Sequence, residues 1–420
     1  MLFDIFNYDI TTAIVSYALA LGALVIFFRK SLTSLADPLF YHILWISSQA
    51  SFLVIYAQAN GANIVYANFA ITLITYIITL WFFCALYRKR ALLEKNATCV
   101  HLKSLVTLTK DRWTTIGLTL VALYLYSNKS FIEYALTCTS PQELFLFRFI
   151  DLQGREPIER ILKISTYFLF LFLFISIRAK KNQKTSIAIT AAMLAIAVAS
   201  GGRSAVISFI VSLGAFFFLL RFESAGRSTK NVNLTIGMLY IVAIIIAATV
   251  TSFYTGGDSL ANGFVVIFNR IFAAPDGIEY YLKFNGEKHI DSGAGPYITS
   301  IFGIYIQRLT EIPYKNIGWQ LTELAVGDVG FAQGSNYTVL LQAVVFSHYL
   351  APVYGMAAGW LVARMRYATP KNPRELFLVY TLSIVCFTFA IDIEYFTLLI
   401  ISLITVYVII VSPILRIKVP

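Results

Sequence analysis

Three arginines of this chain lie in apolar or glycine-rich sequence, where a charged side chain is uncommon. Arg203 follows two consecutive glycines, Arg270 is flanked by apolar residues on both sides, and Arg308 ends a similar apolar stretch. A guanidinium group keeps its charge at physiological pH, and its planar fork matches the oxygens of a phosphate. Three such groups on one face of a protein could hold a pyrophosphate without a metal ion.

Each of these arginines also has a structural explanation. Arg203 could lie in a tight turn and extend its charge to the membrane surface. Either of the other two could form an ion pair with a nearby carboxylate such as Asp276. Taken singly, a structural role is at least as good an interpretation for each arginine, whereas the three together favour the binding of an anion.

Five ionisable residues are candidates for acid–base catalysis: Asp276, Glu279, His289, Glu323 and Asp328. A carboxylate or an imidazole with a pKa near neutral can take the proton of an attacking hydroxyl group. Two of them have a simpler interpretation. The pair Asp276 and Glu279, directly after a proline, is typical of a helix N-terminus with a capping carboxylate. His289 lies in a polar stretch, as surface histidines usually do.

Aromatic and basic side chains follow on the same expected helix. Tyr280, Tyr281 and Lys283 come directly after Glu279. Aromatic residues near the outer face of a membrane commonly serve as interfacial anchors. They also stack against sugar rings, so these three residues are candidates for binding a glycan.

Other chemistries have no support in the sequence. No Gly-x-x-x-x-Gly-Lys loop that would bind ATP is present. Metal sites require clustered His, Cys or carboxylate ligands, but the four histidines are scattered and no pair of cysteines has metal-binding spacing. We therefore expect no metal ion and no other cofactor.

The composition excludes a soluble protein. Of the 420 residues, 58% are hydrophobic and only 13% are charged, and the mean hydropathy is +0.73. Average globular chains are about 45–50% apolar and about 25% charged. The sequence therefore predicts an all-α polytopic membrane protein. We expect residues 1–420 to form a single transmembrane domain.

Eleven segments approach the roughly 20 apolar residues that a helix needs to cross a bilayer. They are Thr11–Phe28, Leu39–Ala57, Ile64–Tyr87, Trp113–Tyr126, Ile161–Ile177, Ser186–Ala199, Ala205–Leu220, Leu234–Phe253, Tyr337–Ala363, Phe377–Ala390 and Tyr395–Val411.

The basic residues predict the orientation. Clusters of Lys and Arg fall at alternate ends of the spans, and such residues beside short loops remain on the cytoplasmic side. We expect an outward N-terminus and an inward C-terminus. The net charge of +11 is then a consequence of topology, and we find no reason to expect a nucleic-acid partner.

Two long insertions fall on the predicted outer face. They comprise residues 127–160 and residues 255–336, and the larger one is expected to cover the active site as a cap. Apolar residues at three- and four-residue spacing predict helices within it at Ala261–Ala274 and Pro296–Leu309. On the inner face, Arg88–Arg112 is expected to lie along the anionic membrane surface.

Gly355 and Gly359 are four residues apart and therefore lie on one face of a helix. Small residues at this spacing let two membrane helices approach closely. We interpret this pair as structural.

Together these features resemble the bacterial O-antigen polymerases of the Wzy type, which belong with the lipid-linked oligosaccharide polymerases and the O-antigen ligases. The features are about eleven spans, the motif Ser200-Gly-Gly-Arg-Ser204 between two of them, a long outer loop with spaced arginines that ends on Gly334-Ser-Asn-Tyr337, and a small-residue stretch from Val353 to Trp360. The resemblance covers most of the chain as architecture.

The resemblance implies a GT-C-like, metal-independent glycosyltransferase of the bacterial inner membrane, with its active site facing the periplasm. It would join undecaprenyl-pyrophosphate-linked repeat units into O-antigen or a related surface polysaccharide. Arg203, Arg270 and Arg308 would stabilise the leaving pyrophosphate. Membrane lipids and a chain-length-regulating co-polymerase would be its partners.

Two other functions remain open. A lipid-linked oligosaccharide flippase has a similar length and number of spans, but it is expected to have short loops on both faces. An O-antigen ligase shares the polymerase architecture, and the sequence separates the two poorly. A receptor or purely structural role is less favoured because charged residues cluster near the membrane on one face.

Overall fold

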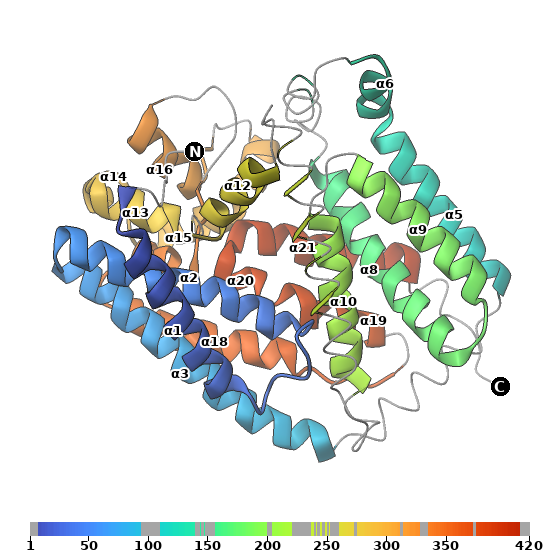
Figure 1. Cartoon of the computed structure of the whole chain (residues 1–420), viewed down its shortest axis with the longest axis horizontal. Helices are drawn as coiled ribbons and strands as arrows, with labels where there is room; N and C mark the ends of the chain where they lie inside the picture. The colour runs from blue at the N-terminus through green and yellow to red at the C-terminus, as the bar shows by residue number, and fades with distance from the viewer. Residues whose placement is uncertain are drawn as a thin grey trace.

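The chain folds as an assembly of helices (Figure 1). The computed structural model describes residues 7–93, 110–138, 156–199, 204–220, 260–272, 275–310, 314–327, 335–372 and 375–411, together with a few single residues between these ranges. Every regular element within these ranges is a helix. The predicted all-α class is therefore confirmed for the described part of the chain.

The helices have the following bounds. The amino-terminal ones are α1 (Ile10–Phe28), α2 (Pro38–Asn60), α3 (Ile64–Leu93), α5 (Lys110–Ser127), α6 (Lys129–Thr137), α8 (Glu156–Ala179), α9 (Gln183–Ala199) and α10 (Ser204–Leu220). Those of the large insertion are α12 (Leu260–Phe272), α13 (Asp276–Lys283), α14 (Gly286–His289), α15 (Ala294–Thr310) and α16 (Ile317–Val326). The carboxy-terminal ones are α17 (Val339–Phe346), α18 (Ala351–Arg366), α19 (Glu375–Val385), α20 (Thr388–Ile391), α21 (Ile393–Val406) and the π-helix η2 (Tyr407–Val411).

Among the described residues, four helices are long and apolar enough to cross a membrane. They are α1, α2, the segment Ile64–Lys89 of α3 and the segment Ile161–Ala179 of α8. This supports a membrane protein. Four of the other expected spans correspond to shorter apolar helices within the described residues, at Gly117–Ser127, Ile207–Leu219, Glu375–Ile391 and Ile393–Ile409. Leu234–Phe253 lies mostly outside the described residues. The total of eleven spans therefore stays a prediction.

The expected span Tyr337–Ala363 is two helices instead of one. α17 ends at Phe346, and α18 begins at Ala351 after a turn at residues 347–350. Pro352 occupies the first turn of α18. A proline has no backbone N–H and disfavours helical conformation in the residue before it, so it can begin a helix but cannot continue one. Hydropathy alone does not detect this break.

In Figure 1, the short helices α13, α14 and α16 of the large insertion lie near the N-terminus, whereas α6 lies on the other side of the molecule, above α5. The expected helices at Ala261–Ala274 and Pro296–Leu309 correspond closely to α12 and α15. The large insertion is thus mostly helical where it is described, and it packs into the same apolar core as α1, α2, α3, α17 and α18.

The most extensive contact between two described helices joins α3 and α18. A methyl group added at Gly355 would lie 2.7 Å from the Thr72 carbonyl oxygen, and one at Gly359 would lie 2.7 Å from the Tyr76 carbonyl oxygen. Both distances are shorter than any side-chain carbon tolerates. The prediction that these glycines permit close helix packing is confirmed.

An ion pair without exposed surface joins the segment between α1 and α2 to the end of α18. Asp37 and Arg366 have 0% exposed side chains, and the Nη1 atom of Arg366 lies 2.8 Å from Oδ1 of Asp37. Nη2 of Arg366 donates to Oδ2 of Asp37 at 3.0 Å and to the Ser31 carbonyl oxygen at 3.1 Å. The guanidinium also lies 4.1 Å from the centre of the Phe218 ring on α10.

Removing one member of this pair should be costly because the other charge then stays buried without compensation. We expect Arg366→Met to lower the free energy of unfolding by about 3–5 kcal/mol, measured as a fall in Tm of the detergent-solubilised protein. The exposed Lys371 provides the control Lys371→Met, for which we expect little change.

The double variant Asp37→Asn/Arg366→Met removes both charges and keeps an acceptor at the start of α2. It should be more stable than Arg366→Met alone. A double variant as unstable as the single one would show that lost packing, and not the unpaired charge, causes the effect.

Candidate functional site

The described part of the structure does not include the side chains of the three arginines of the expected clamp. Arg270 belongs to α12 and Arg308 to α15, but only the helical backbone is described at these positions. Arg203 and Asp328 lie outside the described residues. The pyrophosphate clamp therefore stays a prediction.

Asp276 has the most specific environment among the candidate bases. Its Oδ1 atom accepts three hydrogen bonds: from the backbone N–H of Gly277 at 2.7 Å, from the backbone N–H of Asn336 at 3.0 Å and from Nδ2 of Asn336 at 3.3 Å. Oδ2 accepts no hydrogen bond within the described part of the chain, and the side chain is partly exposed. One oxygen is therefore fixed, and the other has no hydrogen-bond partner within the described residues.

Two close contacts of the backbone bring Asn336 to Asp276. A methyl group added at Gly277 of α13 would lie 2.7 Å from the Asn336 carbonyl oxygen, and one at Gly318 of α16 would lie 2.1 Å from the Ser335 carbonyl oxygen. Ser335 further donates its backbone N–H to the Gly318 carbonyl oxygen at 3.0 Å. The extended segment before α17 is thus held between α13 and α16, because both helices present a glycine to it.

The environment of Asp276 raises the pKa of its carboxyl group toward neutral pH. Burial raises its pKa from about 3.8 to about 7, the N–H donors of Asn336 and Gly277 oppose that shift, and the negative charge of Glu279 adds to it. Desolvation disfavours the charged form of a carboxyl group. A carboxyl group with a pKa close to 7 is suited to exchange a proton with a hydroxyl substrate at physiological pH.

Glu279 occupies a different environment three residues along the same helix. Its side chain is 5% exposed, and its Oε1 atom accepts a hydrogen bond from the Tyr8 hydroxyl at 2.6 Å. Burial raises its pKa, and the hydrogen bond from Tyr8 partly opposes this. The Oε2 atom is buried and has no hydrogen-bond partner within the described residues. Glu279 therefore joins α13 to the segment before α1 and has little access to a substrate.

The expected helix N-terminus after Pro275 is present. α13 begins at Asp276, and Asp276 and Glu279 both lie in its first turn. The helix has no side-chain hydrogen bond from its N-cap residue, so Asp276 acts within the first turn and not as the cap itself. The carboxylate still lies where the helix dipole favours negative charge.

The other candidate bases are placed apart from this site or already paired. His289 is exposed at the end of α14. Both carboxylate oxygens of Glu323 accept hydrogen bonds from Nζ of Lys315, at 2.6 and 2.9 Å. Neither residue is a carboxyl group held through one oxygen only, as Asp276 is.

The aromatic residues expected near sugars face the protein interior. Tyr280 and Tyr281 are 6% and 2% exposed. The ring of Tyr281 packs edge-on against Phe69 of α3, with ring centres 5.8 Å apart. Lys283 is exposed and lies near the ring of Phe284. In this structure the two tyrosine rings pack α13 against the apolar core.

A second carboxyl group with a raised pKa, that of Glu394, is half-buried at the start of α21. Oε1 of Glu394, the residue before the expected span Tyr395–Val411, accepts a hydrogen bond from the Tyr314 hydroxyl at 2.8 Å. Burial and the nearby charge of Asp392 raise the pKa of Glu394 to about 8. The two partners are 80 residues apart in the sequence, so no local motif predicts their contact.

A separate set of polar side chains joins α15 to α17 and α18. The Tyr354 hydroxyl lies 2.6 Å from that of Tyr297 and donates to Oε1 of Gln342 at 2.8 Å. Nε2 of Gln342 donates to the carbonyl oxygens of Tyr337 and Phe389, at 2.8 and 2.9 Å. These hydrogen bonds connect α15 of the large insertion to the break between α17 and α18.

Comparison with family models, curated proteins and solved structures finds no match to this chain. The described residues contain no group of three His, Cys, Asp or Glu side chains that could hold a metal ion. The site is therefore argued from its own geometry.

The raised pKa of Asp276 predicts a pH-dependent contribution to stability. The unfolded chain releases this proton near pH 3.8 and the folded chain near pH 7. The contribution is therefore complete below pH 3.8 and is lost as the pH rises through about 7. Asp276→Asn keeps the Oδ1 acceptor and removes the titration. We expect the Tm of the wild type, relative to this variant, to fall between about pH 4 and about pH 7 and to level off above that.

The same scan on Asp291→Asn, which changes an exposed carboxyl group of the same insertion, provides the control. A wild type whose Tm stays parallel to that of Asp276→Asn over this range would contradict the raised pKa.

Proposed function

We propose that this protein polymerises undecaprenyl-pyrophosphate-linked oligosaccharide repeat units by glycosyl transfer at the periplasmic face of the bacterial inner membrane. The observation that carries the proposal is the Asp276 carboxyl group, which is held through Oδ1 and whose Oδ2 has no hydrogen-bond partner within the described residues. Its position on a helical insertion beside apolar helices of spanning length suits a substrate with a glycan head and a lipid tail.

Asp276 serves as the general base in this proposal. Oδ2 takes the proton of the acceptor hydroxyl group as that oxygen attacks the anomeric carbon of the donor glycan. The bond between the anomeric carbon and the pyrophosphate oxygen breaks, and its electron pair leaves with the pyrophosphate. The proton passes from Asp276 to solvent when the product departs. Asn336 holds Oδ1 and so orients the carboxylate throughout.

The leaving pyrophosphate requires positive charge, which Arg203, Arg270 and Arg308 supply in this proposal. Cationic donors aimed at a developing negative charge lower the barrier most when water is excluded. The transmembrane helices, eleven in the proposed topology, provide a lateral path for the lipid tail. A flippase would need no general base, and a ligase would use the base to transfer the glycan to a different acceptor.

Loss of the base should abolish polymerisation while the protein still reaches the membrane. We expect Asp276→Asn to lower polymer synthesis by at least about 10²-fold, the usual contribution of a general base. Asn336→Ala removes only the longest of the three hydrogen bonds to Oδ1 and keeps both backbone donors, so it should lower synthesis by no more than about tenfold. Asp291→Asn should leave it unchanged. The measurement is the ladder of lipopolysaccharide chain lengths in a deletion strain carrying each variant.

The ladder of the deletion strain also separates the three functions. A single repeat unit on the core indicates a polymerase. The complete absence of repeat units, or the accumulation of lipid-linked polymer, would reject the polymerase in favour of a flippase or a ligase. A normal ladder from Asp276→Asn would reject the assigned base.

The arginine clamp has a test of its own. We expect alanine at each of Arg203, Arg270 and Arg308 to abolish long-chain polymer without loss of the protein from the membrane, because the pyrophosphate then leaves without a compensating charge. Membrane abundance is measured in parallel by immunoblot. Normal polymer from all three variants would refute the clamp.

A further inference from the structure

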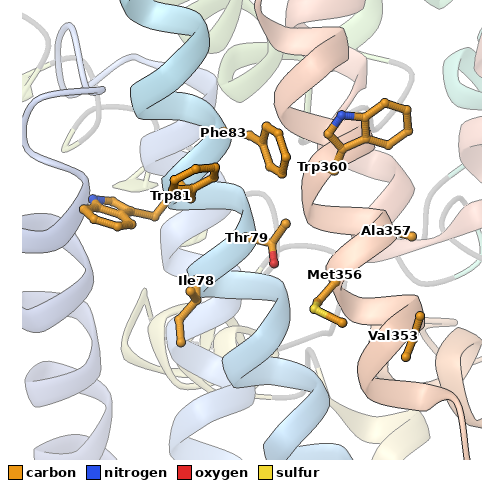
Figure 2. Close-up of a pocket in the computed structure, with 9 residues that line it drawn as sticks. Ile78, Thr79, Trp81, Phe83, Val353, Met356, Ala357 and Trp360 are labelled. Carbon is orange, nitrogen blue, oxygen red and sulfur yellow. The ribbon is translucent and has the colours of Figure 1, made fainter.

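A groove runs along the outer surface of the helix pair α3 and α18 (Figure 2). Its volume is about 500 Å³. Side chains of both helices line it, and they are Ile78, Thr79, Trp81, Phe82, Phe83, Val353, Met356, Ala357 and Trp360. Nearly all are apolar, so the groove suits a hydrocarbon chain.

The groove is open on the side that faces away from the protein core. Phe82, Val353 and Met356 are 52%, 52% and 42% exposed. The α3 segment to which Phe82 belongs is long and apolar enough to cross a membrane, so acyl chains of the surrounding bilayer have direct access to this surface. An apolar surface of this kind gives no preference for one lipid over another.

Preference comes from the polar end of the groove. On α18, Val353, Met356, Trp360 and Arg364 follow one another at intervals of three or four residues and lie on one helix face. Nε1 of Trp360 donates to the Tyr87 hydroxyl at 3.0 Å, and the guanidinium of Arg364 lies 5.7 Å from the centre of the Tyr87 ring. Arg364 is exposed.

A second arginine, Arg88, follows Tyr87 on α3, but it extends toward the segment after α1, where one of its terminal nitrogens donates to the Lys30 carbonyl oxygen. Its Nε atom is buried. Arg364 therefore supplies the positive charge at the polar end of the groove. An apolar groove that ends at two aromatic residues and a guanidinium group is complementary to an anionic amphiphile.

We propose that this groove is a binding site for a phospholipid with an anionic head group, such as phosphatidylglycerol. One acyl chain lies between α3 and α18 against Phe82 and Met356. The head-group phosphate lies at Arg364. Arginine binds phosphate oxygens through charge-assisted hydrogen bonds, and Tyr87 and Trp360 suit the interface between head groups and acyl chains.

The polyprenyl carrier of the proposed reaction does not fit this position. The groove has its cationic end at the carboxy-terminal end of α18, whereas Tyr354 and the bonds to Gln342 lie at the amino-terminal end. A helix of 16 residues is about 24 Å long. A carrier with its pyrophosphate at the Asp276 side would therefore place its charge at the wrong end of this groove.

The test measures lipid binding to the full-length protein in detergent by native mass spectrometry. We expect phosphatidylglycerol to bind about tenfold more tightly than phosphatidylcholine, and Arg364→Gln to remove this difference, since a charge-assisted hydrogen bond contributes roughly one power of ten in affinity. Lys89→Gln removes an exposed charge of the adjoining turn of α3 and should leave the preference intact.

A second variant tests the acyl-chain part of the groove. Met356→Trp fills the groove and should weaken the binding of both phospholipids equally. Equal affinity of the two lipids for the wild type, or a preference that survives Arg364→Gln, would overturn the proposal. Undecaprenyl phosphate that displaces phosphatidylglycerol from the wild type and loses affinity in Arg364→Gln would overturn it in favour of a carrier site.

Discussion

The ion pair between Asp37 and Arg366 is the interaction on which the arrangement of the central helices depends. Neither side chain reaches the surface, and transfer of a guanidinium out of water costs several kcal/mol unless hydrogen bonds and an opposite charge compensate it. Here the compensation comes from the segment before α2, and the face of Phe218 on α10 covers the guanidinium. These parts of the chain must all be in place before the arginine can be buried.

The same helix connects this pair to the candidate site. α18 ends at Arg366, packs closely on α3 through Gly355 and Gly359, and near its start carries Tyr354, which binds Gln342 of α17. α17 in turn continues the extended segment that places Asn336 against Asp276. The site therefore rests on a framework of packed helices, although its catalytic candidate belongs to an insertion.

Sequence reasoning predicted the features that depend on local pattern. Apolar spacing indicated α12 and α15, and two glycines indicated the close packing of α3 and α18. It did not predict the break between α17 and α18, because Pro352 interrupts a stretch that stays apolar throughout. It also could not rank Asp276 above the other candidate bases, since its distinction arises from Asn336, which is 60 residues away and reaches it only through tertiary packing.

The distance in sequence between Asp37 and Arg366 has a consequence for biosynthesis. The two residues are 329 positions apart, and a ribosome adds about 5–20 residues per second. The carboxylate is therefore made roughly 15–65 seconds before its partner exists. During that interval the first helical hairpin carries a charge that the finished protein keeps away from water. The hairpin can pack in its final position only after most of the chain has been synthesised. The amino-terminal end is therefore among the last parts of the protein to reach its final structure.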